Sequence, residues 1–206
     1  METYRVGIIG CGRIASKMED ESDEHPISIA GAFDALSNTK IVAACNRGSE
    51  GLHTFGKKWG VDALYHDYQR MLDKETLDIV CVATHPPLHQ EMVVAAAEAG
   101  AKGIFCEKPM AATLEDAIAM VKAAKASGKI LQIGIHSTFS ANLQFARKLV
   151  DAGITGDIYY AETCDTRRRG IPGGTFTSKK TAGAGATVDI GIYNMHNALY
   201  LMGYPT

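Results

Sequence analysis

Apolar positions gather in short runs that alternate with segments of helical spacing over residues 1–135. We expect buried strands in five of these runs, at residues 6–9, 41–45, 77–83, 103–106 and 130–135. The segments between them predict helices at residues 12–17, 27–36, 52–59, 67–72, 89–99 and 113–127. Strands that alternate with helices in this way favour an α/β fold with a doubly wound parallel sheet.

The pattern changes after residue 135. We expect a helix at residues 142–152, a single long strand at 157–165 and one continuous helix at 187–202. A polar, glycine-rich segment at residues 167–185 separates the last two, and it contains Arg167, Arg168 and Arg169. We therefore place one domain at residues 1–135 and the beginning of a second at residues 136–206.

The turn after the first strand carries the pattern Gly-x-Gly-x-x-Ala, at Gly10, Gly12 and Ala15. A strand that runs into this spacing is typical of a dinucleotide-binding turn, although the pattern by itself also fits an ordinary glycine-rich turn. Gly10 permits a tight turn, and Gly12 lets the backbone approach a pyrophosphate held at the N-terminus of the next helix. The predicted cofactor-binding residues here are Gly10, Cys11, Gly12, Arg13 and Ile14.

The second strand ends at Asn46 and Arg47, where an acidic residue usually binds the adenosine ribose. Without a carboxylate a 2′-phosphate is not repelled, and Arg47 can pair with it. Both residues are therefore predicted to bind the cofactor, and NADP is favoured over NAD. The alternative is that Arg47 stacks on the adenine or is simply solvated.

Two further strand ends carry candidate residues. Thr84, His85, Pro86 and His89 follow the third predicted strand, and Glu107 and Lys108 follow the fourth. Ligands of open α/β sheets bind outside the carboxyl ends of the strands, so all six are predicted to face the cofactor. A lysine there can lower the pKa of a hydroxyl group or donate a hydrogen bond to a carbonyl oxygen.

Asp189, Tyr193 and His196 have a spacing that places them on one face of the last predicted helix. This arrangement indicates a site, but a single histidine on such a helix is more often structural, and a tyrosine also packs well in a core. The three arginines at 167–169 could bind an acidic substrate, although a solvated loop is the simpler interpretation.

Composition and charge narrow the class of protein. The 206 residues carry a formal net charge of −2, so no overall basic field favours nucleic acid as a partner. The sequence shows no leader pattern and no apolar run of about 20 residues, so we expect a cytoplasmic protein. Five cysteines occur singly, which predicts buried free thiols with neither disulfides nor a metal site.

Four motifs of the chain resemble, in this order, those of the Gfo/Idh/MocA oxidoreductase family. They are the glycine turn, Ala83-Thr84 with His89, Glu107-Lys108-Pro109, and residues 189–193. The resemblance spans almost the whole chain. It implies an N-terminal Rossmann domain and a C-terminal α+β domain with a mostly antiparallel sheet, which forms the substrate site and the interface of a homo-oligomer. It also implies hydride transfer between NADP or NAD and a CH–OH or C=O group of a sugar, cyclic polyol or diol.

The resemblance also implies roles for three residues. Lys108 corresponds to the catalytic lysine of the family and Asp189 to the aspartate that contacts a substrate hydroxyl. Tyr193 stands where many relatives have histidine, which is similar to the branches that use a tyrosine as acid and base. No role is transferred to His196.

Other functions fit the same motifs. A redox-assisted glycosidase of the family would keep its NAD through turnover, and a non-catalytic dinucleotide-binding regulator would need neither Lys108 nor Tyr193. Relative to the family, the second domain is expected to be truncated, or to borrow strands from a partner.

Overall fold

The computed structural model describes residues 2–20, 22–166, 177–178 and 185–205. The chain divides into two compact units, Met1–Ile133 and Gly134–Thr206. The three arginines at 167–169 lie outside the described residues.

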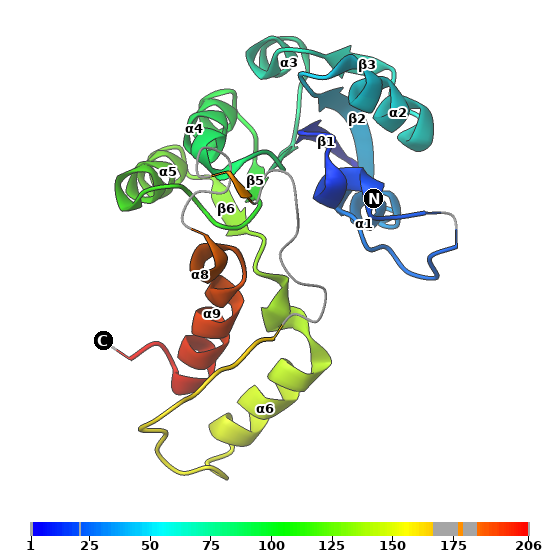
Figure 1. The fold of residues 1–206 in the computed structure, drawn as a ribbon. Coiled ribbons are helices and arrows are strands. Elements are labelled where there is room, and N and C mark those ends of the chain that lie inside the picture. The colour runs from blue at the N-terminus through cyan, green and yellow to red at the C-terminus, as the bar shows by residue number, and fades with distance from the viewer. Residues whose placement is uncertain (1, 21, 167–176, 179–184, 206) are drawn as a thin grey trace. The chain divides into compact units, whose positions relative to one another are not determined.

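The first unit is built on a six-stranded parallel sheet of order β3-β2-β1-β4-β5-β6 (Figure 1). Its strands are β1 (Tyr4–Ile9), β2 (Thr39–Cys45), β3 (Ala63–Tyr65), β4 (Ile79–Val82), β5 (Gly103–Cys106) and β6 (Ile130–Ile133). The strand order reverses between β1 and β4, which is where ligands bind in sheets of this type. The predicted parallel α/β fold of this part of the chain is confirmed.

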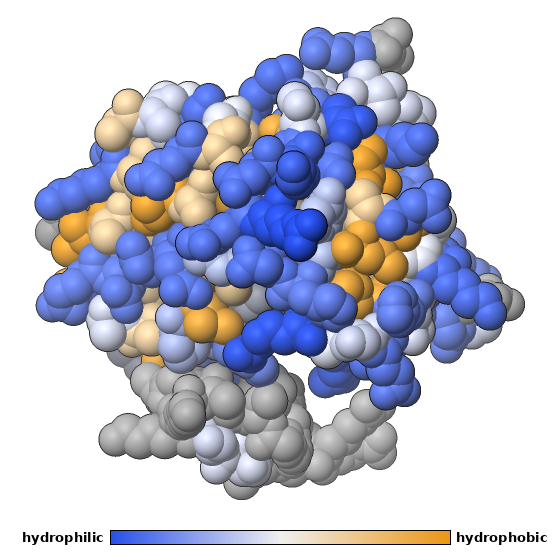
Figure 2. Space-filling model, turned by 90° about the horizontal axis from the view of Figure 1, so that it is seen from above, coloured by the Kyte–Doolittle hydropathy of each residue, from blue (hydrophilic) through white to orange (hydrophobic). Residues whose placement is uncertain are grey.

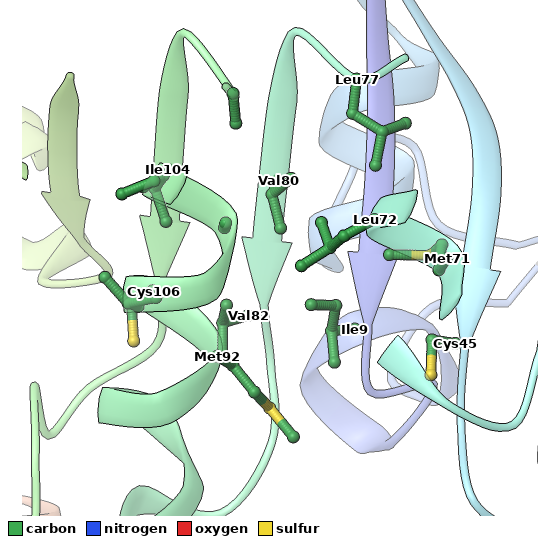
Figure 3. Close-up of a cluster of buried hydrophobic side chains, with 14 of the residues drawn as sticks. Ile9, Cys45, Met71, Leu72, Leu77, Val80, Val82, Met92, Ile104 and Cys106 are labelled. Atoms are coloured by element: carbon green, nitrogen blue, oxygen red, sulfur yellow. The ribbon is translucent and has the colours of Figure 1, made fainter. Parts of the chain in front are cut away.

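Helical segments cover both faces of the sheet. They are η1 (Arg13–Lys17), α1 (Ile29–Asp34), α2 (Ser49–Trp59), α3 (Tyr68–Lys74), η2 (Pro86–Leu88), α4 (His89–Glu98) and α5 (Leu114–Ala126). One buried cluster joins the sheet to α3 and α4 through residues such as Met71 and Met92 (Figure 3) and to α5 through Met120. A second cluster joins the other face to α1 and α2 through Ala30 and Phe55. The sheet is thus doubly wound.

Local signals in the sequence set several of these boundaries. The Thr113 side chain accepts a hydrogen bond from the Asp116 N–H at the start of α5, and Asp67 caps α3 in the same way. Strand β3 was not predicted, because three residues are too short to show a periodicity. The predicted helix at 12–17 is a single π-helical turn.

The second unit contains η3 (His136–Phe139), α6 (Ala141–Asp151), α8 (Ala186–Asp189) and α9 (Gly191–Met202). Three predictions fail here. Residues 157–165 form no strand, since no described segment supplies a ladder partner, and the described residues of this unit contain no antiparallel sheet. The predicted helix at 187–202 is interrupted at Ile190, just before Gly191, a residue that weakens a helix.

Hydrophobic residues on the face in Figure 2 lie in separate patches among hydrophilic ones. Among the described helices, none is long and apolar enough to cross a membrane. The part of the chain that the structure describes also brings together no group of three or more His, Cys, Asp or Glu residues able to hold a metal ion.

Candidate functional site

Four parallel strands end in register at one edge of the sheet. Ile9 of β1 pairs with Cys45 of β2 and with Val82 of β4, which in turn pairs with Cys106 of β5. The residues that follow these four strand ends are therefore brought to the same edge. They include the predicted cofactor-binding residues Gly10, Asn46, Thr84 and Glu107.

The turn after β1 has glycine at two positions, and the structural reason differs between them. Gly10 has φ +98°, and a Cβ on it would lie 2.4 Å from the Ala83 carbonyl oxygen, so the fold itself requires glycine there. Gly12 has φ −84°, and a Cβ on it would meet no protein atom within 4 Å. Protein packing does not require glycine at Gly12, but a group bound against this turn would, which fits a dinucleotide pyrophosphate.

Asn46 ties the glycine turn to the loop that begins α2. Its Oδ1 accepts a hydrogen bond from the Cys11 N–H at 3.2 Å, and its Nδ2 donates to the Gly48 carbonyl at 2.9 Å. The side chain thus orders two backbone segments at the sheet edge. No signal in the sequence showed this role, because both partners are backbone atoms.

Two cations lie by this loop. Arg47 is exposed. Lys17, from the last position of η1, has its ammonium near the start of α2: a Cβ on Gly51 would lie 3.9 Å from Lys17 Nζ. The sequence singled out Arg47 but not Lys17, whose approach depends on how the π-helical turn folds back. Both cations suit an anionic group bound at this corner.

The only tryptophan of the chain reports on the same region. Trp59 Nε1 donates a hydrogen bond to Ser16 Oγ at 2.8 Å, and Ser16 is a buried residue of η1. A change at the glycine turn should therefore alter the surroundings of the indole.

The predicted cofactor-binding residue His89 lies at the start of α4. The side chain is fully buried and touches backbone oxygens on both sides: Nδ1 lies 3.0 Å from the Pro109 carbonyl and Nε2 lies 3.2 Å from the Thr84 carbonyl. Burial lowers the pKa of His89, although these hydrogen bonds oppose that effect. His89 therefore links the Thr84 loop to the turn after β5. His85 and Pro86 are half-buried in the Thr84 loop.

Glu107 and Lys108 form the turn after β5, where the Lys108–Pro109 peptide bond is cis. Glu107 Oε2 accepts a hydrogen bond from the Lys108 N–H at 3.1 Å. Burial raises the pKa of Glu107, and the hydrogen bond and the positive charge of Lys108 act in the opposite direction. The Lys108 side chain is half-buried.

Asp189 and Tyr193 belong to the second unit. Because the helix is interrupted at Ile190, Asp189 ends α8 while Tyr193 lies in the first turn of α9, so the two residues do not lie on one continuous helix as predicted. The Tyr193 hydroxyl lies 3.2 Å from His136 Nδ1.

His196, on α9, contacts a hydroxyl group of η3. Its Nε2 lies 2.7 Å from the Thr138 hydroxyl, and burial lowers its pKa. This supports the structural interpretation of His196.

Four of the five cysteines are buried, and all five are free thiols. Burial raises the pKa of Cys11 to about 12 and that of Cys45 to about 11, so both remain protonated and unreactive near neutral pH. Cys164 is exposed.

Two family models match the chain. Residues 4–135 match an oxidoreductase family described as having an NAD-binding Rossmann fold, and residues 143–206 match the GFO/IDH/MocA C-terminal domain.

Among curated proteins, D-glucoside 3-dehydrogenase of Escherichia coli strain K12 is 34% identical over 202 residues, which are 98% of this chain and 54% of that protein. Inositol 2-dehydrogenase 3 of Saccharopolyspora erythraea is 34% identical over 174 residues, 82% of this chain and 47% of that protein. The chain spans about half the length of these relatives.

A solved structure of aldose–aldose oxidoreductase from Caulobacter crescentus, complexed with glycerol, is similar along nearly the whole chain. The TM-score is 0.79 at 29% identity, and the match covers 98% of this chain and 58% of that one. Since the first family model alone matches residues 4–135, which is more than half of the sequence, the chain belongs to the Gfo/Idh/MocA oxidoreductase family, with an NAD-binding Rossmann domain.

Proposed function

We propose that the protein is an NAD(P)-dependent dehydrogenase that acts on a CH–OH group, or in reverse on a C=O group, of a sugar, cyclic polyol or diol. The observation that carries the proposal is the turn after β1. The fold requires glycine at Gly10, whereas a Cβ on Gly12 would meet no protein atom within 4 Å, which leaves room for a ligand. The names of the relatives, which act on a glucoside, an inositol or an aldose, support the substrate class.

The proposed catalytic residues are Lys108, Asp189 and Tyr193. A bound nicotinamide would supply the hydride acceptor or donor. Lys108 would donate a hydrogen bond to the substrate oxygen and lower the pKa of the hydroxyl, Tyr193 would exchange the proton of that oxygen, and Asp189 would orient a substrate hydroxyl. Support comes from the family resemblance of each residue's motif.

The cofactor is proposed to be held by the residues at the sheet edge and the loops that follow. Gly10, Cys11, Gly12, Arg13 and Ile14 supply the turn, and Thr84, His85, Pro86 and Glu107 flank it. Asn46 and His89 would act by ordering the loops through their backbone partners.

NADP is the proposed preference. Asn46 carries no charge that would repel a 2′-phosphate, and both exposed Arg47 and Lys17 at the start of α2 could pair with one.

We also propose that the protein assembles as a homo-oligomer through its second domain. Several large apolar side chains of this unit are exposed, among them Phe139, Phe145 and Tyr159. Residues 157–165, which form no strand here, would gain ladder partners in such an assembly. A cytoplasmic location is supported by the four buried free thiols, which suit a reducing compartment.

The test of the proposed function is a titration of the chain with NADPH and with NADH, followed by Trp59 fluorescence, and then an oxidation assay with methyl glucosides, inositols and aldoses. Saturable binding and formation of reduced nicotinamide with one of these substrates support the proposal. Binding without turnover of any of them, or no binding, contradicts it. Lys108→Ala should keep the binding and lose the turnover.

A further inference from the structure

Tyr193 has a solvent-exposed partner that the proposed chemistry does not yet use. The Tyr193 hydroxyl lies 3.2 Å from His136 Nδ1, within hydrogen-bond range, and the two ring centroids are 4.9 Å apart with an interplanar angle of 60°. Tyr193 is half-buried on α9, whereas His136 is exposed at the start of η3. The pair thus connects a half-buried phenol to a ring that water can reach.

The position of His136 is fixed by its neighbours. Three consecutive side chains of η3 pair with α9: His136 with Tyr193, Ser137 with Asn197 at 2.7 Å, and Thr138 with His196 at 2.7 Å. The Thr138 carbonyl also accepts a hydrogen bond from Gln144 Nε2 of α6. These contacts hold the backbone of His136 against α9 and restrict the imidazole to the neighbourhood of the phenol.

We propose that His136 relays protons between Tyr193 and solvent during turnover, which makes it a positioning and proton-transfer partner of the proposed acid and base. The inference rests on the proposed function, because it requires Tyr193 to exchange a proton with the substrate. A phenol has an ordinary pKa near 10, so a tyrosine acting near neutral pH needs a group that takes up or returns its proton. Histidine is the side chain suited to that task.

The proton balance of alcohol oxidation follows directly. A bound oxidised nicotinamide would accept the hydride of the substrate C–H bond, and the substrate O–H proton would pass to the Tyr193 phenolate. The phenol then passes this proton to His136 Nδ1, and the imidazole releases the proton on Nε2 to water. Proton exchange of the exposed ring with water restores the Nε2-protonated tautomer before the next turnover. One alcohol and one oxidised nicotinamide thus yield one carbonyl, one reduced nicotinamide and one solvent proton, and reduction runs through the same steps in reverse.

The test compares His136→Gln and His136→Ala with Ser137→Ala, a matched control that removes the neighbouring contact between η3 and α9. General acid–base groups contribute about 10²- to 10⁴-fold to rates. We therefore expect both His136 variants to lower kcat at least ~10-fold with KM for the sugar unchanged. Free imidazole in the buffer should restore much of kcat in His136→Ala and none in Tyr193→Phe. Ser137→Ala should lower kcat less than the His136 variants do, because the Thr138–His196 contact still holds the start of η3 against α9 and the imidazole is present.

A direct check of the pair uses ¹⁵N spectra of the histidine side chains in the parent chain and in Tyr193→Phe. The His136 Nδ1 signal should change when the phenol hydroxyl is lost, with or without substrate. The relay alone is overturned if the parent chain is active and the His136 variants keep its kcat. It is also overturned if Ser137→Ala loses as much kcat as the His136 variants and free imidazole restores none of the loss in His136→Ala. A parent chain that oxidises no sugar or polyol overturns the proposed function and the relay with it.

Discussion

Replacing each glycine of the turn after β1 by alanine should separate folding from cofactor binding. At Gly10, the new Cβ would lie 2.4 Å from the Ala83 carbonyl oxygen on a backbone with φ +98°. A left-handed conformation costs about 1–2 kcal/mol for an L-residue, and overpacking adds about 1–3 kcal/mol. We therefore expect Gly10→Ala to lower the free energy of unfolding by ~2–5 kcal/mol, a large part of the ~5–15 kcal/mol typical of a native protein.

Gly12→Ala should behave in the opposite way. The φ of −84° suits any residue, and no protein atom lies within 4 Å of the added Cβ. The free energy of unfolding should change by no more than about 0.5 kcal/mol, as for most surface substitutions. The methyl group would, however, occupy space into which a pyrophosphate must come, so NADPH affinity should fall at least ~10-fold, or about 1.4 kcal/mol.

Both quantities can be measured with the same probe. Urea unfolding and cofactor titration are each followed by the fluorescence of Trp59, the only tryptophan, which is hydrogen-bonded to Ser16 just after the turn. A Gly12→Ala chain that binds NADPH as tightly as the parent would refute the close approach of a ligand to this turn. A Gly10→Ala chain as stable as the parent would refute the packing argument.

Further predictions concern the cofactor loop, the buried His89 and the thiols. Arg47→Ala should weaken NADPH binding much more than NADH binding in parallel titrations, and equal losses would contradict the 2′-phosphate assignment. Asn46→Ala should weaken both cofactors alike, because it loosens the turn through Cys11 and Gly48 rather than one phosphate. Burial lowers the pKa of His89 below its ordinary value near 6.5. The unfolded chain then binds more protons there, so this contribution to stability is complete above about pH 6.5 and is lost as the pH falls through the folded-state pKa. Urea midpoints between pH 8 and pH 5 should show this decline. His89→Gln should reduce the decline and leave the part due to His196, whose pKa is also lowered by burial. An unchanged slope would contradict this. A thiol-disulfide exchange reagent should modify Cys164 rapidly and the four buried cysteines only after unfolding, and more than one rapid thiol would contradict the burial.

Most of the first unit could be predicted because each of its strands but one is a clear apolar run. The exception, β3 at Ala63–Tyr65, is paired only with β2 and is too short to leave a pattern. The prediction failed in the second unit for a different reason. A run such as residues 157–165 has strand-like composition, but whether it becomes a strand depends on a partner elsewhere, which composition does not encode.

The same holds for the candidate site: the sequence shows which residue types are present, but not which partners their side chains contact. Gly10, Lys108 and Tyr193 were singled out because their types and spacings carry chemistry that a motif exposes. Asn46 and His89 were also singled out, but as residues that bind the cofactor. Their contacts with backbone atoms, and the contact of His136 with a distant side chain, are not revealed by any local pattern.

Contacts with backbone and contacts with a side chain should respond differently to substitution. Two of the three supporting residues contact backbone, Asn46 at the glycine turn and His89 at the turn after Lys108, so their loss should disturb binding and stability together. His136 instead meets a side-chain hydroxyl at an exposed position, so its loss should slow turnover while the fold and cofactor binding persist. Stability, affinity and kcat measured on one set of variants at these three positions would therefore distinguish loop ordering from proton transfer.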